Sequence, residues 1–336
     1  MALFAYNCLF SSGGQVKELK PIDICEKYVS GESGCEFQSD AIGGFCRLPD
    51  MFKCPVYDYF FYGTISVSQA NTWMRCHRSY QHKYMDGIEV LDKMLNKNMK
   101  IGRLIHEGME QIYSDKPVNV DYGRYFSDED TREIGIVKVM LDKLVTLKRP
   151  VEPCLPEEGF TIQLTDCPEI RGVIDVLYAE HFTEFKTSGN PDYYLTPHYL
   201  QSQLGTYFLS DSKLKYCTMK VIRIPQLKSA GQYKDEAGEK YVERVRLDVE
   251  KRPAYYFIGL DESGSWGKKF WRTEFDMDEI VERYRHIMHE RRLAIKRGCF
   301  YKNQTACLYP NPCMYLQLCE TDGVSELIYK YKEKPE

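Results

Sequence analysis

Three polar side chains interrupt two apolar runs near the middle of the chain. Asp175 lies in the run GVIDVL, and Glu184 and Lys186 lie in the run HFTEFKT that follows it. Both runs are rich in β-branched and aromatic residues, so we expect two strands joined by a turn at residues 179–182. Two carboxylates and an ammonium group inside a sheet are costly unless a ligand uses them. Such oxygen ligands favour a hard divalent cation, with the lysine beside a reacting phosphate or water.

The pairing of these strands determines which side chains meet. A hairpin centred between Glu180 and His181 places Asp175 opposite Lys186. Side chains alternate between the two faces of a strand, so Asp175, Glu184 and Lys186 then emerge on the same face. This stretch therefore predicts a metal-binding hairpin.

A candidate for a third ligand lies on a helix predicted before the hairpin. Residues 101–113 have apolar residues at helical spacing, and within them His106 and Glu110 lie four residues apart on one side. A single helical histidine is more often structural than a ligand, so His106 gains weight only from the carboxylates. Glu110 is as consistent with a residue that supports the metal site as with a solvated surface glutamate.

The remaining elements follow from periodicity and from capping residues. We expect helices from Ser66 or Ser68 to Tyr80 and at residues 88–95, 127–148, 196–210 and 277–297. Further strands are expected at residues 160–164, 216–224 and 255–260, with a polar excursion between the last two. The 196–210 helix places Gln203 and Tyr207 one turn apart on the same face.

The cysteines indicate a second kind of metal site. Cys307, Cys313 and Cys319 follow one another at equal spacing, and the two prolines between them argue against ordinary core packing. A soft metal centre needs about four thiolates, so one more must come from elsewhere. Cys299 is the nearest source and Cys76, on the first helix, a distant one. Structural zinc held by four cysteines fits the same residues.

Composition limits the class of protein. The 43% hydrophobic and 28% charged residues are typical of a soluble globular chain. No apolar run reaches the ~20 residues needed to cross a bilayer, and the N-terminus lacks the basic region of a signal peptide, so we expect a cytoplasmic protein without membrane contact. The net charge of −4 gives no sign of a nucleic-acid partner. Residues 283–302 are nevertheless strongly basic, which is usually a solvated face and, near a phosphate-cleaving site, a backbone contact.

Taken together, these motifs resemble the PD-(D/E)XK nuclease superfamily. The nearest branch resembles the RecB-like and CRISPR-associated exonucleases with an iron–sulfur cluster, which are also found among phage recombination proteins. Each motif alone is weak, and the order of all of them gives the resemblance its strength. The matching segments are CHRSY with Cys76, GRLIHEGME with His106, GVID with Asp175, EFK with Glu184 and Lys186, QLGTY with Gln203 and Tyr207, and the terminal cysteines.

The resemblance implies an α/β, restriction-endonuclease-like core, with a mixed central sheet flanked by helices and a C-terminal cysteine-rich clasp. It implies a nuclease domain at residues 63–325 that includes the helix around Cys76 and the tail 299–319. Residues 1–62 would be an N-terminal extension and residues 326–336 a charged tail. The implied activity is metal-dependent DNA hydrolysis by an exonuclease acting on ends or single strands in recombination, replication or repair.

The resemblance also assigns roles to single residues. Asp175, Glu184 and Lys186 would be catalytic. His106, Asp175, Glu184 and the backbone carbonyl of Phe185 would hold Mg²⁺ or Mn²⁺. Lys186 would orient or deprotonate the attacking water and offset charge at the phosphate, and Gln203 and Tyr207 would contact the strand or brace Lys186.

Cys76, Cys307, Cys313 and Cys319 would hold a [4Fe–4S] cluster, with Cys299 as a reserve ligand. The family places the first two terminal cysteines only two residues apart, whereas position 310 here is proline. The expected partner is DNA in a bacterial or phage-infected cell. No GxxxxGK[ST] segment is present, so coupling to a helicase or recombination protein would need a separate chain. The alternative is a non-catalytic nucleic-acid-binding or assembly module stabilised by zinc.

Overall fold

The computed structural model describes residues 64–164, 169–228, 236–308, 312–321 and 323–332, with the backbone alone of residues 197–201. These residues form two compact units. Unit 1 takes in the described parts of residues 1–87, 162–171 and 281–310, and unit 2 those of residues 88–161, 172–280 and 311–336. The predicted N-terminal extension, residues 1–62, lies outside the described residues.

Unit 2 is built on a mixed sheet. Its strands are β3 (Leu155–Ile162), β4 (Glu169–Leu177), β5 (His181–Ser188), β6 (Tyr216–Arg223) and β7 (Lys268–Trp271). The pair β4–β5 is antiparallel, β5–β6 is parallel and β6–β7 is antiparallel, while β3 pairs with β4. A parallel pair needs a crossover connection, which α7 (Pro197–Ser210) supplies between β5 and β6.

The hairpin turn lies one residue earlier than the sequence pattern predicts. It occupies residues 178–181, and a 2.9 Å hydrogen bond joins the N–H of its first residue to the carbonyl of its last. The observed register places Asp175 level with Glu184, so the predicted pairing of Asp175 with Lys186 is wrong by two residues. A shift of two residues preserves the alternation of side chains. The three polar groups therefore still belong to one face.

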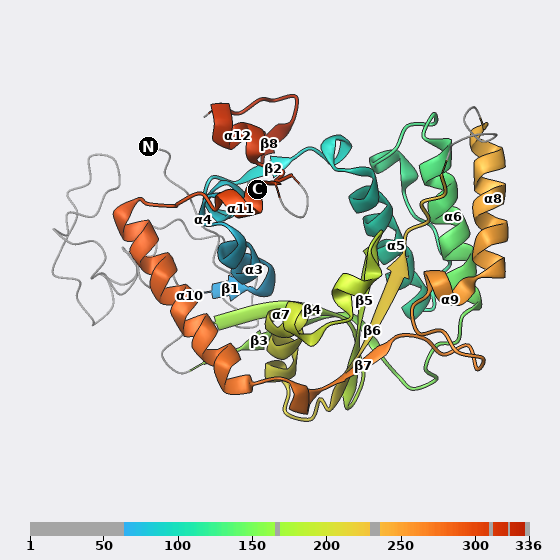
Figure 1. The fold of residues 1–336 in the computed structure, drawn as a ribbon. Helices are drawn as coiled ribbons and strands as arrows, with labels where there is room; N and C mark the ends of the chain where they lie inside the picture. The colour runs from blue at the N-terminus through green and yellow to red at the C-terminus, as the bar shows by residue number, and fades with distance from the viewer. Residues whose placement is uncertain (1–63, 165–168, 229–235, 309–311, 322, 333–336) are drawn as a thin grey trace, which may run out of the picture. The chain divides into compact units, whose positions relative to one another are not determined.

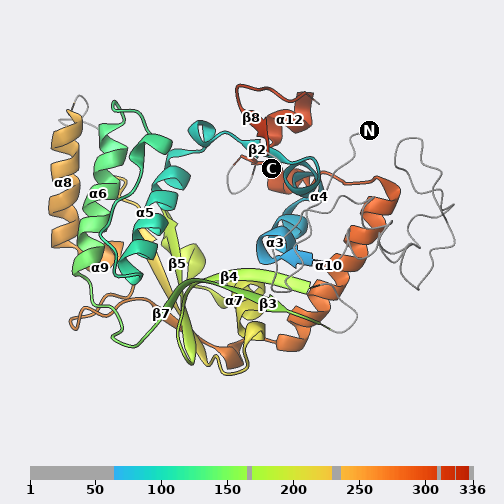
Figure 2. The same cartoon turned by 180° about the vertical axis from the view of Figure 1, so that it is seen from behind.

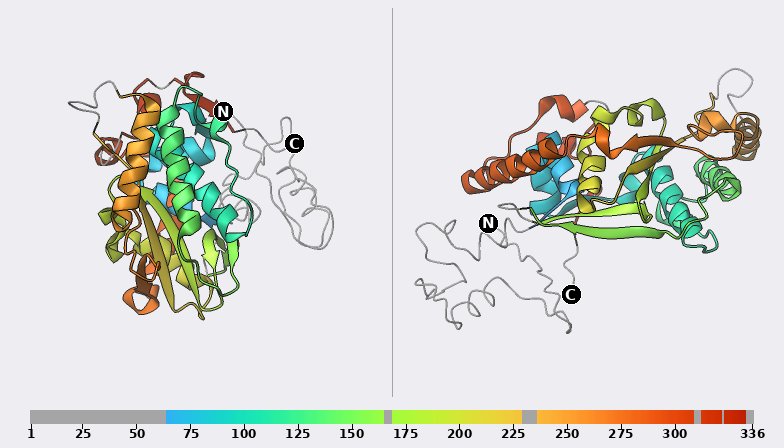
Figure 3. Two further views of the ribbon diagram at one scale, coloured as in Figure 1. Left: turned by 90° about the vertical axis from the view of Figure 1, so that its right-hand side faces the viewer. Right: turned by 90° about the horizontal axis from the view of Figure 1, so that it is seen from below.

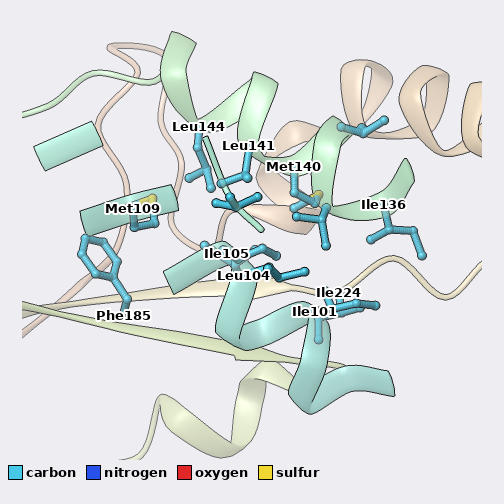
Figure 4. Close-up of a cluster of buried hydrophobic side chains, with 14 of the residues drawn as sticks. Ile101, Leu104, Ile105, Met109, Ile136, Met140, Leu141, Leu144, Phe185 and Ile224 are labelled. Carbon is cyan, nitrogen blue, oxygen red and sulfur yellow. The ribbon is translucent and has the colours of Figure 1, made fainter. Parts of the chain in front are cut away.

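Three helices extend outward from one face of the sheet: α5 (Lys97–Tyr113), α6 (Thr131–Thr146) and α8 (Gly238–Lys251). They lie side by side in Figures 1 and 2 and in the left view of Figure 3. Leu104 on α5 and Met140 and Leu141 on α6 are buried in one cluster with Phe185 of β5 (Figure 4). Gly108 allows the close approach, because a Cβ there would lie 2.4 Å from Leu141 Cδ2. This core fixes α5 against the strand that carries the acidic residues.

Helix α7 covers the other face of the sheet. Phe208 of α7 is fully buried, and its ring lies 5.0 Å from the ring of Phe182 on β5. Phe182 has the same strand parity as Glu184, whereas Phe185 faces α5. A mixed sheet flanked by α5 and α7 confirms the predicted α/β fold class, in a restriction-endonuclease-like arrangement.

Unit 1 contains the segment around Cys76, which the sequence predicts to be helical. Its elements are β1 (Thr64–Ser66), α3 (Val67–Arg75), α4 (His77–Tyr80), the π-helix Gln81–Met85, most of α10 (Met277–Arg297) and α11 (Gln304–Leu308). Ser66 caps α3 through a capping box with Gln69, as predicted. The expectation of one continuous helix through Cys76 is wrong, because this residue is extended (φ −167°) and separates α3 from α4.

Helix α10 confirms the long helix predicted near the C-terminus. Asp276 caps it by accepting a 3.0 Å hydrogen bond from the Glu279 N–H. Gly298 follows its last residue with φ +61°, a conformation that favours glycine. Within the basic run, Arg291 is buried and its guanidinium lies 5.6 Å from the centre of the Tyr80 ring. This arginine therefore stabilises unit 1 and is no part of a solvated face.

Two predicted elements differ in the structure. Residues 88–95, expected as a helix, form β2 (Ile88–Val90) and a short 3₁₀ turn. In unit 2, β2 pairs with β8 (Tyr329–Tyr331), which lies in the segment expected as a charged tail, and α12 (Leu316–Thr321) packs nearby. Residues 255–260, expected as a strand, contain the end of α9 (Pro253–Tyr256) and a single bridge. A short apolar run can form either a helix or a strand, and the tertiary partners of these two segments decided both outcomes.

In the described part of the chain, no helix has the length and apolar character to span a membrane.

Candidate active site

The site begins where β4 and β5 separate. Their antiparallel ladder ends at Val176 and Thr183, just before Asp175. Beyond that point the side chain of Asp175 replaces the backbone partner, because its Oδ2 accepts a 2.6 Å hydrogen bond from the Phe185 N–H. The carboxylate is therefore held at the gap between the strands.

Glu184 is the most enclosed acidic group of the site, with 1% of its surface exposed. Its Oε1 accepts hydrogen bonds from the Lys186 ammonium and from Gln203 Nε2, the latter at 2.9 Å. Gln203 Nε2 also lies 2.8 Å from the Tyr207 hydroxyl, so α7 fixes this oxygen from the side. Glu184 Oε2 is buried and has no hydrogen-bond partner among the residues that the structure describes. Burying such an atom without a partner is costly.

The two carboxyl groups are electrostatically strained. Burial raises the pKa of Asp175 to about 6, outweighing the opposite effects of Lys186 and the Phe185 N–H. Burial and the nearby Asp175 charge raise the pKa of Glu184 to about 7. Burial lowers the pKa of Lys186, yet Glu184 and Asp175 raise it more, so its net shift is upward. One ammonium group thus only partly balances two buried carboxylates.

His106 comes to this site from α5. Its ring lies 6.3 Å from the Phe185 ring and makes a hydrogen bond to the Phe185 backbone. Burial, and then the charge of Lys186, lower the pKa of His106 to about 4, against the opposite effect of Glu184. The imidazole is therefore neutral near pH 7, the form that ligates metal ions.

A further carboxylate, Glu157 on β3, was missed from the sequence. Burial is the largest cause of the raised pKa of Glu157, and the charges of Glu110 and Glu184 raise it further. The charge of Glu157 in turn raises the pKa of Asp175. Its φ of +50° is rare for a residue with a side chain, and such strain is typical of functional sites. The sequence placed the start of this strand at residue 160, whereas β3 begins at Leu155. Glu157 therefore seemed to lie in a connection, and no sequence signal reports a positive φ at glutamate.

Two of the four proposed cysteine ligands lie in unit 1 and two in unit 2. In unit 1, Cys76 Sγ accepts a hydrogen bond from the Asn303 N–H at 3.5 Å, and Cys307 Sγ donates to the Asn303 carbonyl at 3.4 Å. In unit 2, burial is the largest cause of the raised pKa of Tyr329, and the charges of Cys313 and Cys319 raise it further. Each pair therefore adjoins one common residue. Cys299, the reserve ligand, is exposed.

The structure brings His106, Asp175, Glu184, Lys186, Gln203 and Tyr207 together around the β4–β5 gap. Across the described ranges, no three His, Cys, Asp or Glu side chains are arranged as a metal-binding group. The chemistry of the donors nevertheless fits a hard cation: two carboxylates, a neutral imidazole, and one buried carboxylate oxygen without a partner. Such a cluster can bind a divalent ion beside an ammonium group, a combination that suits phosphodiester hydrolysis.

Comparison with known proteins supports the same chemistry. Residues 64–320 match the family model of the PD-(D/E)XK nuclease superfamily, which confirms the superfamily that the order of motifs predicts. No curated protein matches the chain.

Proposed function

The chain belongs to the PD-(D/E)XK nuclease superfamily, and on this premise we propose that it is a Mg²⁺- or Mn²⁺-dependent DNA exonuclease acting on ends or single strands. Its setting would be recombination, replication or repair. The observation that carries the proposal is Glu184, a buried carboxylate with one oxygen held by Lys186 and Gln203 and the other without a partner. A nuclease uses such an oxygen to hold a metal ion.

The ion would be held by His106, Asp175, Glu184 and the carbonyl of Phe185. Burial raises the pKa of both carboxyl groups, so a cation among them would stabilise their ionised forms. When bound, the ion supplies Lewis acidity, lowering the pKa of water and offsetting charge on the phosphate oxygens. Among the described carboxylates, Glu157 lies close enough to influence Asp175 and would add negative charge at the edge of the site.

The other residues would act on the substrate. The Lys186 ammonium is anchored by one oxygen of Glu184, which leaves it able to orient the attacking water and to offset charge at the scissile phosphate. Gln203 on α7 hydrogen bonds to the same oxygen and contacts Tyr207. These two side chains would therefore fix the orientation of the Glu184 carboxylate and border the bound DNA strand.

Incubation of the purified protein with end-labelled DNA and Mn²⁺ tests this proposal. We expect progressive shortening of the DNA, no cleavage with a chelator, and a higher Tm with Mn²⁺ because the ion binds only the folded state. Asp175→Asn should abolish cleavage and reduce the Tm shift. Asp142→Asn, which neutralises an exposed carboxylate on α6, is the matched control and should retain both. Equal cleavage by wild type and Asp175→Asn would contradict the proposed site.

We also propose that Cys76, Cys307, Cys313 and Cys319 bind a [4Fe–4S] cluster. Cys76 and Cys307 both hydrogen bond to Asn303, and Cys313 and Cys319 both act on the pKa of Tyr329, which supports these four residues as the ligands. Three of the four sulfurs are half-buried and one is buried, as suits a cluster shielded from solvent.

Anaerobic purification followed by iron, sulfide and zinc analysis tests the cluster. We expect a brown protein with iron and sulfide, a loss of both in Cys76→Ser, and their retention in the control Cys154→Ser. Losing the cluster should also lower the Tm, because bound metal stabilises the fold. Loss in Cys299→Ser with retention in Cys307→Ser would assign the ligand to Cys299. A colourless protein with stoichiometric zinc would replace the cluster by a structural zinc site.

A further inference from the structure

A cavity of 1060 Å³ adjoins the candidate active site within unit 2. The first turns of α5 form one wall, and residues 187–190, the end of β5 and the two residues after it, form another. His106 belongs both to this lining and to the candidate metal site, and Thr187, another lining residue, directly follows Lys186 in β5. A polymer bound in the cavity would therefore border the candidate site.

The charge of the cavity differs from that of the whole chain. The protein carries a net charge of −4, yet no aspartate or glutamate is among the described residues that line the cavity, and two are cationic, Lys97 and Arg103. Both cations also pair with carboxylates outside the lining, Glu133 and Asp92 respectively. Most other lining residues are neutral hydrogen-bonding groups, so the lining itself presents no negative charge to oppose a bound polyanion.

An aromatic side chain borders the cavity close to the catalytic lysine. Tyr194 ends the short 3₁₀ turn after β5 and lines the cavity, whereas the adjacent Tyr193 does not. Burial raises the pKa of Tyr194, and the charge of Lys186 opposes this shift, which places the phenol within the field of the ammonium group. An aromatic ring that lines the cavity can stack on a nucleobase bound there.

We infer that this cavity binds an unpaired segment of the DNA strand, with the base next to the scissile phosphate stacked on Tyr194. The inference rests on the proposed function, which supplies the strand. A base stacked on protein must leave its neighbours, and in a duplex this unstacking costs a few kcal/mol. Single-stranded DNA meets no such cost, so the cavity makes unpaired strands the preferred substrate class.

Fluorescence anisotropy with a labelled oligothymidylate tests the inference in a chelating buffer, where cleavage does not interfere. Tyr194→Ala should weaken binding by about tenfold, since stacking on an aromatic side chain contributes roughly 1–3 kcal/mol per base. Tyr194→Phe keeps the ring and should bind like the wild type. Tyr331→Ala, which removes an exposed tyrosine outside the cavity lining, is the control and should also bind normally. A blunt duplex of equal length should bind more weakly than the single strand.

The outcomes separate this inference from the proposed function. Unchanged binding by Tyr194→Ala, an equal loss in Tyr331→Ala, or tighter binding of the duplex would overturn the inference even if the wild type cleaves DNA. Tyr194-dependent binding by a protein that cleaves no DNA with Mn²⁺ would support the inference and contradict the exonuclease.

Discussion

Lys186→Met is expected to slow DNA cleavage about a thousandfold, the usual scale for removing a charged group that acts on the transition state. The Lys186 ammonium hydrogen bonds to Glu184 and is the cation nearest the two buried carboxylates. Methionine has a similar length and no charge, so the scissile phosphate would lose the ammonium group while β5 remains packed. Initial rates at saturating DNA and Mn²⁺ measure the effect.

The matched control is a second largely buried lysine on the neighbouring strand. Lys220 pairs with Phe185 in the β5–β6 register and therefore faces α5, away from Glu184 and Lys186. Lys220→Met should keep most of the wild-type rate. In Lys186→Met, a retained rise of Tm with Mn²⁺ would show that the metal ligands are intact and that the loss is chemical. Comparable rates for the two variants would instead assign Lys186 a structural role.

The chemistry of the site could be predicted because it depends on residue types and on strand parity. Asp175, Glu184 and Lys186 needed only to share a face, and that result survives an error of two residues in the register. His106 was recognisable from helical spacing once the carboxylates were known. Its closeness to the Phe185 backbone depends on the packing of α5 against β5, which a helical pattern does not encode.

The features that the sequence did not predict depend on tertiary packing. The break at Cys76 interrupts an otherwise regular helical pattern. The Cys76 Sγ accepts a hydrogen bond from the N–H of Asn303, a residue far along the chain. Residues 88–90, in the segment predicted as a helix, form a strand because β8 supplies a partner from near the end of the sequence. The cavity beside Tyr194 is formed by segments that are remote in sequence, so no local motif marks it.

The stability of the protein should rise between pH 8 and pH 10 through Lys220. This side chain is 4% exposed, and its Nζ lies 2.8 Å from the Tyr113 hydroxyl and 5.0 Å from the centre of the Trp266 ring. Burial lowers the pKa of Lys220 from 10.5 to about 8. Above this pH the folded protein has released a proton that the unfolded chain still binds, so raising the pH favours folding until the unfolded lysine also titrates.

Urea unfolding of wild type and Lys220→Met at pH 7 and pH 10 measures this contribution. The difference in unfolding free energy should shift by up to about 3 kcal/mol in favour of the wild type as the pH rises, since one pKa unit corresponds to about 1.4 kcal/mol. Lys213→Met, which removes an exposed lysine before β6, corrects for the loss of one charge. Parallel pH profiles for wild type and Lys220→Met would contradict the prediction.

The position of the pH window depends on what holds the Lys220 ammonium inside the core. The Tyr113 hydroxyl accepts its hydrogen bond, and the rings of Tyr113 and Trp266 face it at cation–π distances. Tyr113→Phe keeps the ring and removes the acceptor, so it should lower the pKa of Lys220 further. The rise in stability should then begin at a lower pH than in the wild type. An unchanged onset would show that the aromatic rings, and not the hydroxyl, stabilise the charged lysine.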